Sequence, residues 1–320
     1  MSLPVAPVGT AAVPDLPHGH TALRLTWKFL PPDVRALVES HLGGPVVEAV
    51  SQDSGFTPGF ASVLTTAAGE RAFVKAASKQ AQTAFAAAYT EEARKLEILG
   101  DTIPTPRLEW FHEDDTWVVL GFEAVDARQP RRPWRPAELD RALDLAEAIA
   151  DATRDVPASL ELNSIVDDLP ELVTGWDAAP EDWPHRAEAA RLAKALPGLP
   201  GSDRFVHCDL RDDNILFATD GRALACDWNW PALGPAWLDL VVLLISAHGD
   251  GLEVDPLLAE RDLTRGVDPE QIDVWLAAYC GFMLTSRIRP VPPSSPYLRA
   301  HANWCAEAAW SWLAQRRAWI

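Results

Sequence analysis

A short stretch near the middle of the chain gathers the side chains that phosphoryl transfer needs. Residues 205–214 read FVHCDLRDDN, which places a carboxylate at Asp209, a guanidinium at Arg211 and a carboxamide at Asn214. Asp227 follows at the end of a second apolar run, ALACDW. Together these groups supply an acceptor for a hydroxyl proton, a cation for phosphate and two oxygen ligands for magnesium. The residue types and their spacing therefore predict a site for phosphoryl transfer.

Apolar residues on both sides of this stretch predict the strands that position it. Phe205-Val206 before it and Ile215-Leu216-Phe217 after it indicate two short strands of a hairpin, with the polar residues on the joining loop. Asp220-Gly221 predicts a turn, which would place Asp227 on the next strand, facing the loop. The alternative is an ordinary hairpin with a polar, solvated loop and no chemistry.

The order His207, Asp209, Asn214 and then a strand-borne Asp227 resembles the catalytic core of the aminoglycoside phosphotransferase and choline kinase-like enzymes, which share the protein kinase fold. The resemblance implies that Asp209 is the catalytic base and that Asn214 and Asp227 bind Mg²⁺. It also places Arg211 where many protein kinases carry a lysine against the γ-phosphate. His207 is expected to be a hydrogen-bonding strut, and the neighbouring acids Asp212 and Asp213 are interpreted as solvated.

Three strands are predicted in the first third of the chain, over 46–50, 60–65 and 71–76. The first two are joined by QDSGFTPGF, residues 52–60, a connection that covers the ATP phosphates in the resembled family. Gly55 and Gly59 would let backbone N–H groups approach those phosphates closely. A plain turn is the alternative interpretation of this loop.

Lys75 lies inside the apolar strand AFVKAA, where the kinase fold holds the α- and β-phosphates of ATP. An outward-facing lysine on an edge strand is the alternative. The helix predicted over 81–99 offers a carboxylate partner, because Glu92 lies on the stripe of Phe85, Tyr89, Leu96 and Leu99. A buried carboxylate needs a cation, so Glu92 is preferred to Glu91, which is expected to form an exposed pair with Lys95.

Two further strands, over 107–112 and 116–122, lead to Glu123-Ala124-Val125. In a kinase-like cleft the backbone of Glu123 and Val125 would bond the adenine edge. The polar, proline-rich run ARQPRRPWRP, residues 127–136, then precedes a helix predicted over 137–153.

The chain is therefore predicted to have three parts. These are a mobile N-terminal arm over 1–20, an ATP-binding lobe over 21–125 and a lobe over 126–320 that carries the catalytic loop, the metal ligands and the substrate site. The expected fold class is α+β and bilobal, with an antiparallel sheet plus helix in the first lobe and a larger, mainly helical second lobe; a short helix is also predicted over 33–42. Further helices are predicted over 183–196, 239–247, 256–263, 269–284 and 296–319. Asp239, at the start of the second of these, is expected to cap its helix and brace the catalytic loop.

Composition restricts the partners of the protein. The net charge of −18 argues against nucleic acid or an anionic membrane, and it is compatible either with a cationic substrate or with a role in solubility alone. From Asp126 on, 31 acids against 19 bases mildly favour an amine-bearing substrate. No secretory signal is visible, and the four cysteines have no close-paired spacing. Reduced thiols in a cytoplasm are therefore expected.

The hypothesis that unites these features is an ATP- and Mg²⁺-dependent kinase acting on a hydroxyl of a small molecule, such as an aminoglycoside-like antibiotic or an amino sugar. A kinase for a neutral sugar or nucleoside is the alternative within the same class. A nucleotide-binding pseudokinase that acts by interaction is the alternative from another class. It would need neither the base nor both metal ligands.

Overall fold

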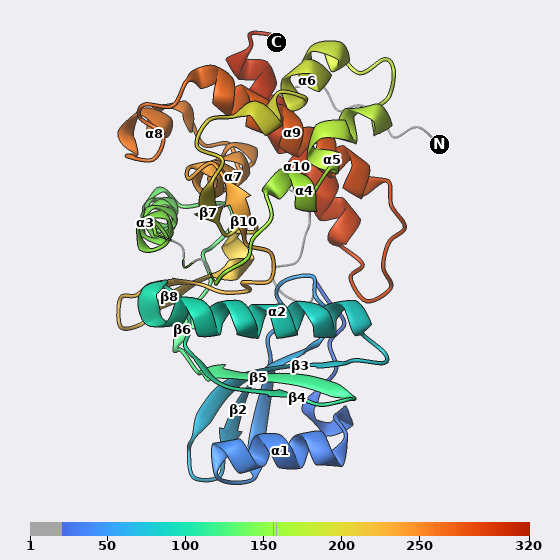
Figure 1. Cartoon of the computed structure of the whole chain (residues 1–320), viewed down its shortest axis with the longest axis vertical. Helices are drawn as coiled ribbons and strands as arrows, with labels where there is room; N and C mark the ends of the chain where they lie inside the picture. The colour runs from blue at the N-terminus through green and yellow to red at the C-terminus, as the bar shows by residue number, and fades with distance from the viewer. Residues whose placement is uncertain (1–20, 156, 158) are drawn as a thin grey trace.

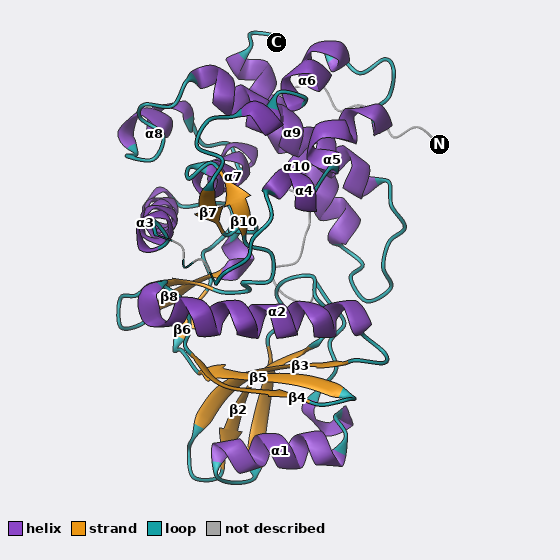
Figure 2. Ribbon diagram, viewed as in Figure 1, coloured by secondary structure: helices purple, strands orange, loops and turns teal. Residues whose placement is uncertain are grey.

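The chain folds into a sheet-rich part and a helix-rich part, which meet at the long helix α2 (Figures 1 and 2). The computed structural model describes residues 21–155, 157 and 159–320, so the predicted N-terminal arm, residues 1–20, lies outside the described residues. Helices cover much of the second part, as expected, and the α+β class is confirmed. In the described part of the chain, no helix has the length and apolar character needed to cross a membrane.

The first part is a five-stranded sheet in the order β1-β2-β3-β5-β4, in which every neighbouring pair is antiparallel. Its strands are β1 (Val46–Ser51), β2 (Phe60–Thr66), β3 (Arg71–Ser78), β4 (Leu108–Glu113) and β5 (Trp117–Glu123). Strand β3 therefore lies at the centre, hydrogen-bonded on both sides. A residue on β3 whose side chain points away from solvent is held firmly in place.

Two helices cover the two faces of this sheet: α1 (Pro32–Leu42) on one face and α2 (Thr83–Leu99) on the other (Figure 1). Because strand residues alternate between faces, Val74, Ala76 and Val119 pack with α1, whereas Val118 and Leu120 pack with α2. This alternation turns Lys75, which lies between Val74 and Ala76, towards α2.

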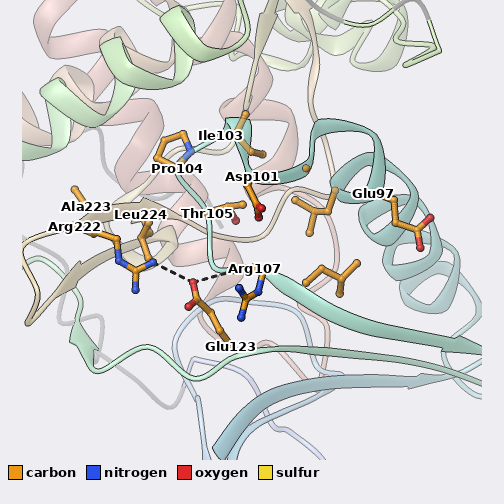
Figure 3. A pocket seen from close by; sticks show the side chains of 13 residues that line it. Glu97, Asp101, Ile103, Pro104, Thr105, Arg107, Glu123, Arg222, Ala223 and Leu224 are labelled. Atoms are coloured by element: carbon orange, nitrogen blue, oxygen red, sulfur yellow. Dashed lines mark hydrogen bonds and ion pairs between the residues drawn. The ribbon is translucent and has the colours of Figure 1, made fainter. Parts of the chain in front are cut away.

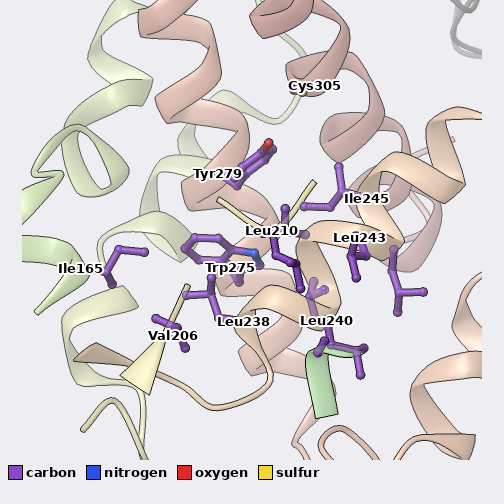
Figure 4. Close-up of a cluster of buried hydrophobic side chains, with 14 of the residues drawn as sticks. Ile165, Val206, Leu210, Leu238, Leu240, Leu243, Ile245, Trp275, Tyr279 and Cys305 are labelled. Atoms are coloured by element: carbon purple, nitrogen blue, oxygen red, sulfur yellow. The ribbon is translucent and has the colours of Figure 1, made fainter. Parts of the chain in front are cut away.

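The second part is built mainly from helices around a buried aliphatic and aromatic core (Figure 4). Helix α7 runs through this core, and its Leu240 and Leu243 are fully buried. The elements in chain order are β6 (Ala127–Arg128), α3 (Pro136–Ala152), α4 (Ile165–Asp168), α5 (Glu171–Thr174), α6 (Arg186–Ala193), β7 (Arg204–Val206), the 3-10 turn η5 (Asp212–Asn214), β8 (Ile215–Ala218), β9 (Ala223–Ala225), β10 (Ala232–Gly234), α7 (Leu238–Gly249), α8 (Asp255–Glu260), α9 (Pro269–Arg287) and α10 (Leu298–Arg316).

The strands beside residues 207–214 pair differently from the prediction. Strand β7 pairs with β10, and β8 pairs with β9 and β6, so β7 and β8 do not form a hairpin. The chain leaves β7 through Cys208, whose φ of 66° turns it out of the extended conformation, and it reaches β8 only after η5. The hairpin around Asp220-Gly221 is the β8–β9 pair, and Asp227 lies two residues beyond its end.

Candidate active site

Lys75 lies on the central strand β3, and its side chain points towards α2. Its Nζ atom is 2.8 and 2.9 Å from the two carboxylate oxygens of Glu92 and 2.7 Å from Oδ1 of Asp227. The rings of Tyr89 and Phe122 lie 5.4 and 5.8 Å from the same ammonium. The interpretation of Lys75 as an outward-facing lysine on an edge strand is therefore wrong.

Glu92 is 1% exposed and also accepts a hydrogen bond from the Trp228 backbone N–H. The expected exposed pair between Glu91 and Lys95 is wrong. Glu91 pairs with Arg94, while Lys95 is buried and donates to the Asn229 carbonyl. Lys95 lies one turn after both acids, so helix geometry alone does not choose between them; its ammonium turns inward to the Asn229 carbonyl, and Arg94 takes its place beside Glu91.

The charges around Lys75 support one another. Burial disfavours its ammonium, but the carboxylates of Asp227 and Glu92 outweigh this effect and raise the pKa of Lys75 above its ordinary value. Burial alone would raise the pKa of Asp227, yet Lys75 holds that pKa below the usual value. Lys75 is therefore a cation and Asp227 an anion at neutral pH.

Backbone strain marks both segments of the site. Asp227 has a φ of 70° and Cys208, next to Asp209, has a φ of 66°. Left-handed conformations are costly for residues with a Cβ and cluster at functional sites, where the surrounding structure holds them. At Asp227 this hold comes from Lys75 and from Asn229 Nδ2, which lies 2.6 Å from Asp227 Oδ1.

The predicted catalytic loop, residues 207–214, brings Asp209, Arg211 and Asn214 together. Asn214 Nδ2 donates to the Asp209 carbonyl at 2.8 Å and to its carboxylate at 3.1 Å. Arg211 lies 3.2 Å from the Asp209 carboxylate and 3.0 Å from that of Asp213. Burial raises the pKa of Asp209 to about 7, although Arg211 opposes this shift. A carboxylate with a pKa near neutrality suits proton transfer at the pH of a cell.

The side chains of Asp239 and His207 hold this loop in place. Asp239 accepts hydrogen bonds from the backbone N–H groups of His207 and Cys208 at 2.7 and 2.9 Å. His207 Nε2 lies 3.2 Å from the Cys226 carbonyl, and burial lowers the pKa of His207 to about 4, so its ring is neutral. The ring thus ties the catalytic loop to the segment that carries Asp227. The expected helix cap is wrong, because Trp237 occupies the N-cap of α7 and the Asp239 carboxylate is used by the loop.

The adjacent acids Asp212 and Asp213 are not solvated, contrary to expectation. Their side chains are 19% and 18% exposed, and each is paired with an arginine. Asp212 lies 2.7 Å from Arg132, whereas Asp213 pairs with Arg211. Buried carboxylates are costly unless a cation neutralises them, so the two arginines allow these acids to lie inside the loop.

The glycine-containing connection between β1 and β2 folds over the catalytic loop. A Cβ at Gly55 would lie 3.8 Å from the Asp213 carboxylate, and one at Gly59 would lie 2.6 Å from the Tyr89 hydroxyl. Gly55 therefore lies beside the catalytic loop, whereas Gly59 packs against α2. Between them, the Phe56 ring lies 5.5 Å from the Arg211 guanidinium and 4.9 Å from the His301 ring.

The segment that joins the two parts starts at Glu123, at the end of β5, and includes Val125. The Glu123 carboxylate lies 3.2 Å from Arg222 and accepts the Arg107 backbone N–H (Figure 3). It lines a cavity of about 690 Å³ between the end of α2 and the β8–β9 hairpin. Its side chain is thus separate from the Lys75–Asp227 cluster, and adenine binding by the backbone of Glu123 and Val125 stays a prediction.

Sequence reasoning missed residues of the linker that follows this segment. Gln129 Nε2 lies 2.7 Å from Ser54 Oγ and 2.7 Å from the Asp213 carbonyl, and so joins the glycine-containing connection to the catalytic loop. Arg132 reaches Asp212 in the same way. The abundance of proline and arginine in this stretch indicated only a boundary, because no local pattern shows which distant loop a linker contacts.

The chain has counterparts among known proteins. A family model described as the phosphotransferase enzyme family matches residues 55–291. No curated protein sequence matches the chain. An aminoglycoside phosphotransferase from Alicyclobacillus acidocaldarius superposes with a TM-score of 0.56 at 16% identity, over 91% of this chain and 96% of that one.

Two other solved structures share the fold. Choline kinase LicA from Streptococcus pneumoniae has a TM-score of 0.56 at 15% identity and covers 86% of this chain and 97% of its own. A thermostable mutant of aminoglycoside phosphotransferase APH(4)-Ia, solved with ADP and hygromycin B, has a TM-score of 0.55 at 14% identity, with 89% and 97% coverage. The family match spans most of the chain, and the structures agree in fold over nearly its full length. The chain therefore belongs to the phosphotransferase enzyme family and has a bilobal, protein kinase-like fold.

Proposed function

We propose that this protein is an ATP- and Mg²⁺-dependent kinase that transfers phosphate to a hydroxyl group of a small molecule. The observation that carries the proposal is the buried contact of Lys75 with both Glu92 and Asp227, next to a loop that holds Asp209 and Asn214 together. A lysine fixed between two carboxylates is suited to phosphate, and the loop offers a base and further oxygen ligands.

The oxygen atoms at the site fit Mg²⁺, a hard cation that prefers carboxylate and carboxamide oxygens. Asp227 Oδ1 is used by Lys75 and Asn229, while the amide nitrogen of Asn214 is used by Asp209, which leaves Asp227 Oδ2 and Asn214 Oδ1 for a metal. Asn229 Oδ1 is buried next to Asp227, and it accepts no hydrogen bond from any residue that the structure describes. When bound, the metal would neutralise charge on the transferred phosphate.

Different residues of the site have different roles in the phosphoryl transfer. Asp209 accepts the proton of the attacking hydroxyl at its carboxylate, and Asn214 orients that carboxylate. Lys75 binds the α- and β-phosphates, with Glu92 holding its ammonium in place. Arg211 stabilises the negative charge of the phosphoryl group as it moves between oxygens.

For the acceptor we propose an amine-bearing hydroxyl compound, such as an aminoglycoside or amino sugar. Over residues 126–320 the chain has 31 acidic against 19 basic side chains, a surplus that attracts cations. The test is ATP turnover with panels of aminoglycosides, amino sugars, neutral sugars and nucleosides. Turnover confined to neutral acceptors would contradict the amine preference. ATP binding without turnover on any panel would favour the pseudokinase.

Glu92→Gln is expected to lower kcat/KM by roughly tenfold or more, equivalent to about 1.4 kcal/mol of transition-state stabilisation. The glutamine keeps the shape of the side chain, but Lys75 loses one of its two carboxylate partners and moves from the phosphates. Steady-state kinetics with varied ATP measure this loss.

Glu91→Gln is the matched control on the same helix. It breaks only the exposed pair with Arg94, an interaction worth about 0.3–0.5 kcal/mol. We expect kcat/KM to stay within about twofold of the wild-type value. Equal losses in both variants would mean that α2 transmits a general disturbance, and Glu92 would have no special role.

Arg211→Ala is expected to lower kcat by a similar factor for every accepted substrate, with small changes in their relative KM values. Arg211→Lys should restore part of the rate, because an ammonium supplies the charge but not the planar pair of donors. Kinetics on three or more acceptors measure the pattern. A loss confined to some acceptors would place Arg211 in the acceptor pocket instead.

A further inference from the structure

Arg132 joins three segments that lie far apart in the sequence. Its Nε and one terminal nitrogen donate to the two oxygens of Asp250 at 2.6 and 2.8 Å, and its other terminal nitrogen donates to Asp212 at 2.7 Å. The arginine side chain is 11% exposed and that of Asp250 is fully buried. A planar guanidinium with all three nitrogens engaged is fixed in one orientation.

Asp250 itself is a well-defined anchor. It follows the last residue of α7 and also accepts the Trp134 backbone N–H at 2.7 Å. A carboxylate at the C-terminal end of a helix is disfavoured by the helix dipole, so this position needs a strong cation. Arg132 supplies that cation, and its guanidinium lies 4.8 Å from the Trp304 ring on α10.

Both ends of helix α7 are therefore connected to the catalytic loop. Near its start, Asp239 accepts the backbone N–H groups that precede Asp209. At its end, Asp250 acts through Arg132 on Asp212, which follows Asp209. The interior of α7 is buried core, so the two ends form a rigid frame about 18 Å long.

Asp212 is the residue of this network that belongs to the loop carrying Asp209 and Asn214. It begins η5, the turn that ends at Asn214, and Asn214 in turn bonds the Asp209 carboxylate. Asp250 alone would neutralise Arg132, whereas Asp212 has Arg132 as its paired cation. The contact therefore holds Asp212 beside Arg132 and sets the place of η5 relative to α7.

We propose that Arg132 is a positioning residue for phosphoryl transfer: it acts through Asp212 to hold η5, and so to fix Asn214 and Asp209 in their reactive arrangement. This inference rests on the proposed function of the 209–214 loop. Displacements of about 1 Å at a catalytic group can cost about 100-fold in rate, so a loosened η5 has a measurable consequence.

Asp212→Asn tests the contact with η5 without disturbing the buried Arg132–Asp250 pair, and Arg132→Lys tests the arginine that joins the two carboxylates. We expect each to lower kcat by about 10- to 100-fold, while KM for ATP changes by less than about threefold. The double variant should be no slower than the slower single variant, because both changes break one connection. Arg131→Ala, which removes the neighbouring exposed arginine side chain, should keep kcat within about twofold of the wild type.

Three outcomes would each overturn the proposal. The first is a wild-type kcat in Asp212→Asn, and the second is a double variant whose losses add. The third is a changed KM for ATP with an unaltered kcat. A second measurement needs no acceptor. Amide hydrogen exchange over residues 207–215 should speed up in Asp212→Asn and Arg132→Lys but not in Arg131→Ala. Unchanged exchange would overturn the positioning role. Faster exchange in a protein that phosphorylates no acceptor would instead leave the positioning intact and contradict the proposed function.

Discussion

Asp209→Asn is expected to lower kcat by roughly 10²- to 10⁴-fold, the usual cost of removing a general base. Asparagine has nearly the same volume and its carbonyl oxygen can still accept from Asn214 Nδ2, so the loop should keep its shape. The variant cannot accept the hydroxyl proton. Binding of Mg²⁺-ATP, measured by calorimetry, should remain close to the wild-type value, because Lys75 and Asp227 are untouched.

The variant also removes the ion pair between Asp209 and Arg211, and a control must separate this effect from loss of the base. Asp213→Asn does so, because Asp213 is the other carboxylate partner of Arg211 and is 3.0 Å from it. We expect Asp213→Asn to lower kcat far less than Asp209→Asn. Equal losses would assign the effect to the charge of Arg211, and near-wild-type kcat in Asp209→Asn would remove Asp209 from the base role.

The parts of the site that periodicity predicts are those held by one regular element. Lys75 alternates with Val74 and Ala76 on β3, and Glu92 shares a helical stripe with Tyr89 and Leu96. The helical repeat and the cost of an unpaired buried charge predict that Glu92 points inward and needs a cation. The strand repeat alone permits either direction for Lys75, so its contact with Glu92 is predicted only together with the resemblance to the kinase fold.

The errors arose where a long-range contact decides the outcome. Strand β7 pairs with β10 rather than with β8, and no feature of either short strand specifies its partner. Acidic loop residues are commonly solvated, which is the expectation for Asp212, yet Arg132, 80 residues earlier, pairs with it. Asp239 braces the loop, as expected, but it does not cap α7, because its carboxylate accepts the backbone N–H groups of His207 and Cys208.

Asp227→Ala is expected to weaken binding of Mg²⁺-ATP by roughly tenfold or more and to lower kcat as well. Asp227 supplies the only carboxylate among the two proposed metal ligands, and Asn214 alone is a poor site for magnesium. The alanine also leaves Lys75 with Glu92 as its one carboxylate partner, so the ammonium stays paired and the fold should survive. Calorimetric titration of ATP at several Mg²⁺ concentrations measures the effect.

Glu92→Gln provides the comparison that isolates the metal. Both variants remove one carboxylate from Lys75, but only Asp227→Ala removes an oxygen that the metal would use. Asp227→Ala should therefore raise the Mg²⁺ concentration needed for half-maximal ATP binding, whereas Glu92→Gln should leave that concentration near the wild-type value. If both variants shift it equally, the shift reflects the charge of Lys75. Unchanged Mg²⁺-ATP affinity in Asp227→Ala would show that Asp227 serves Lys75 alone and binds no metal.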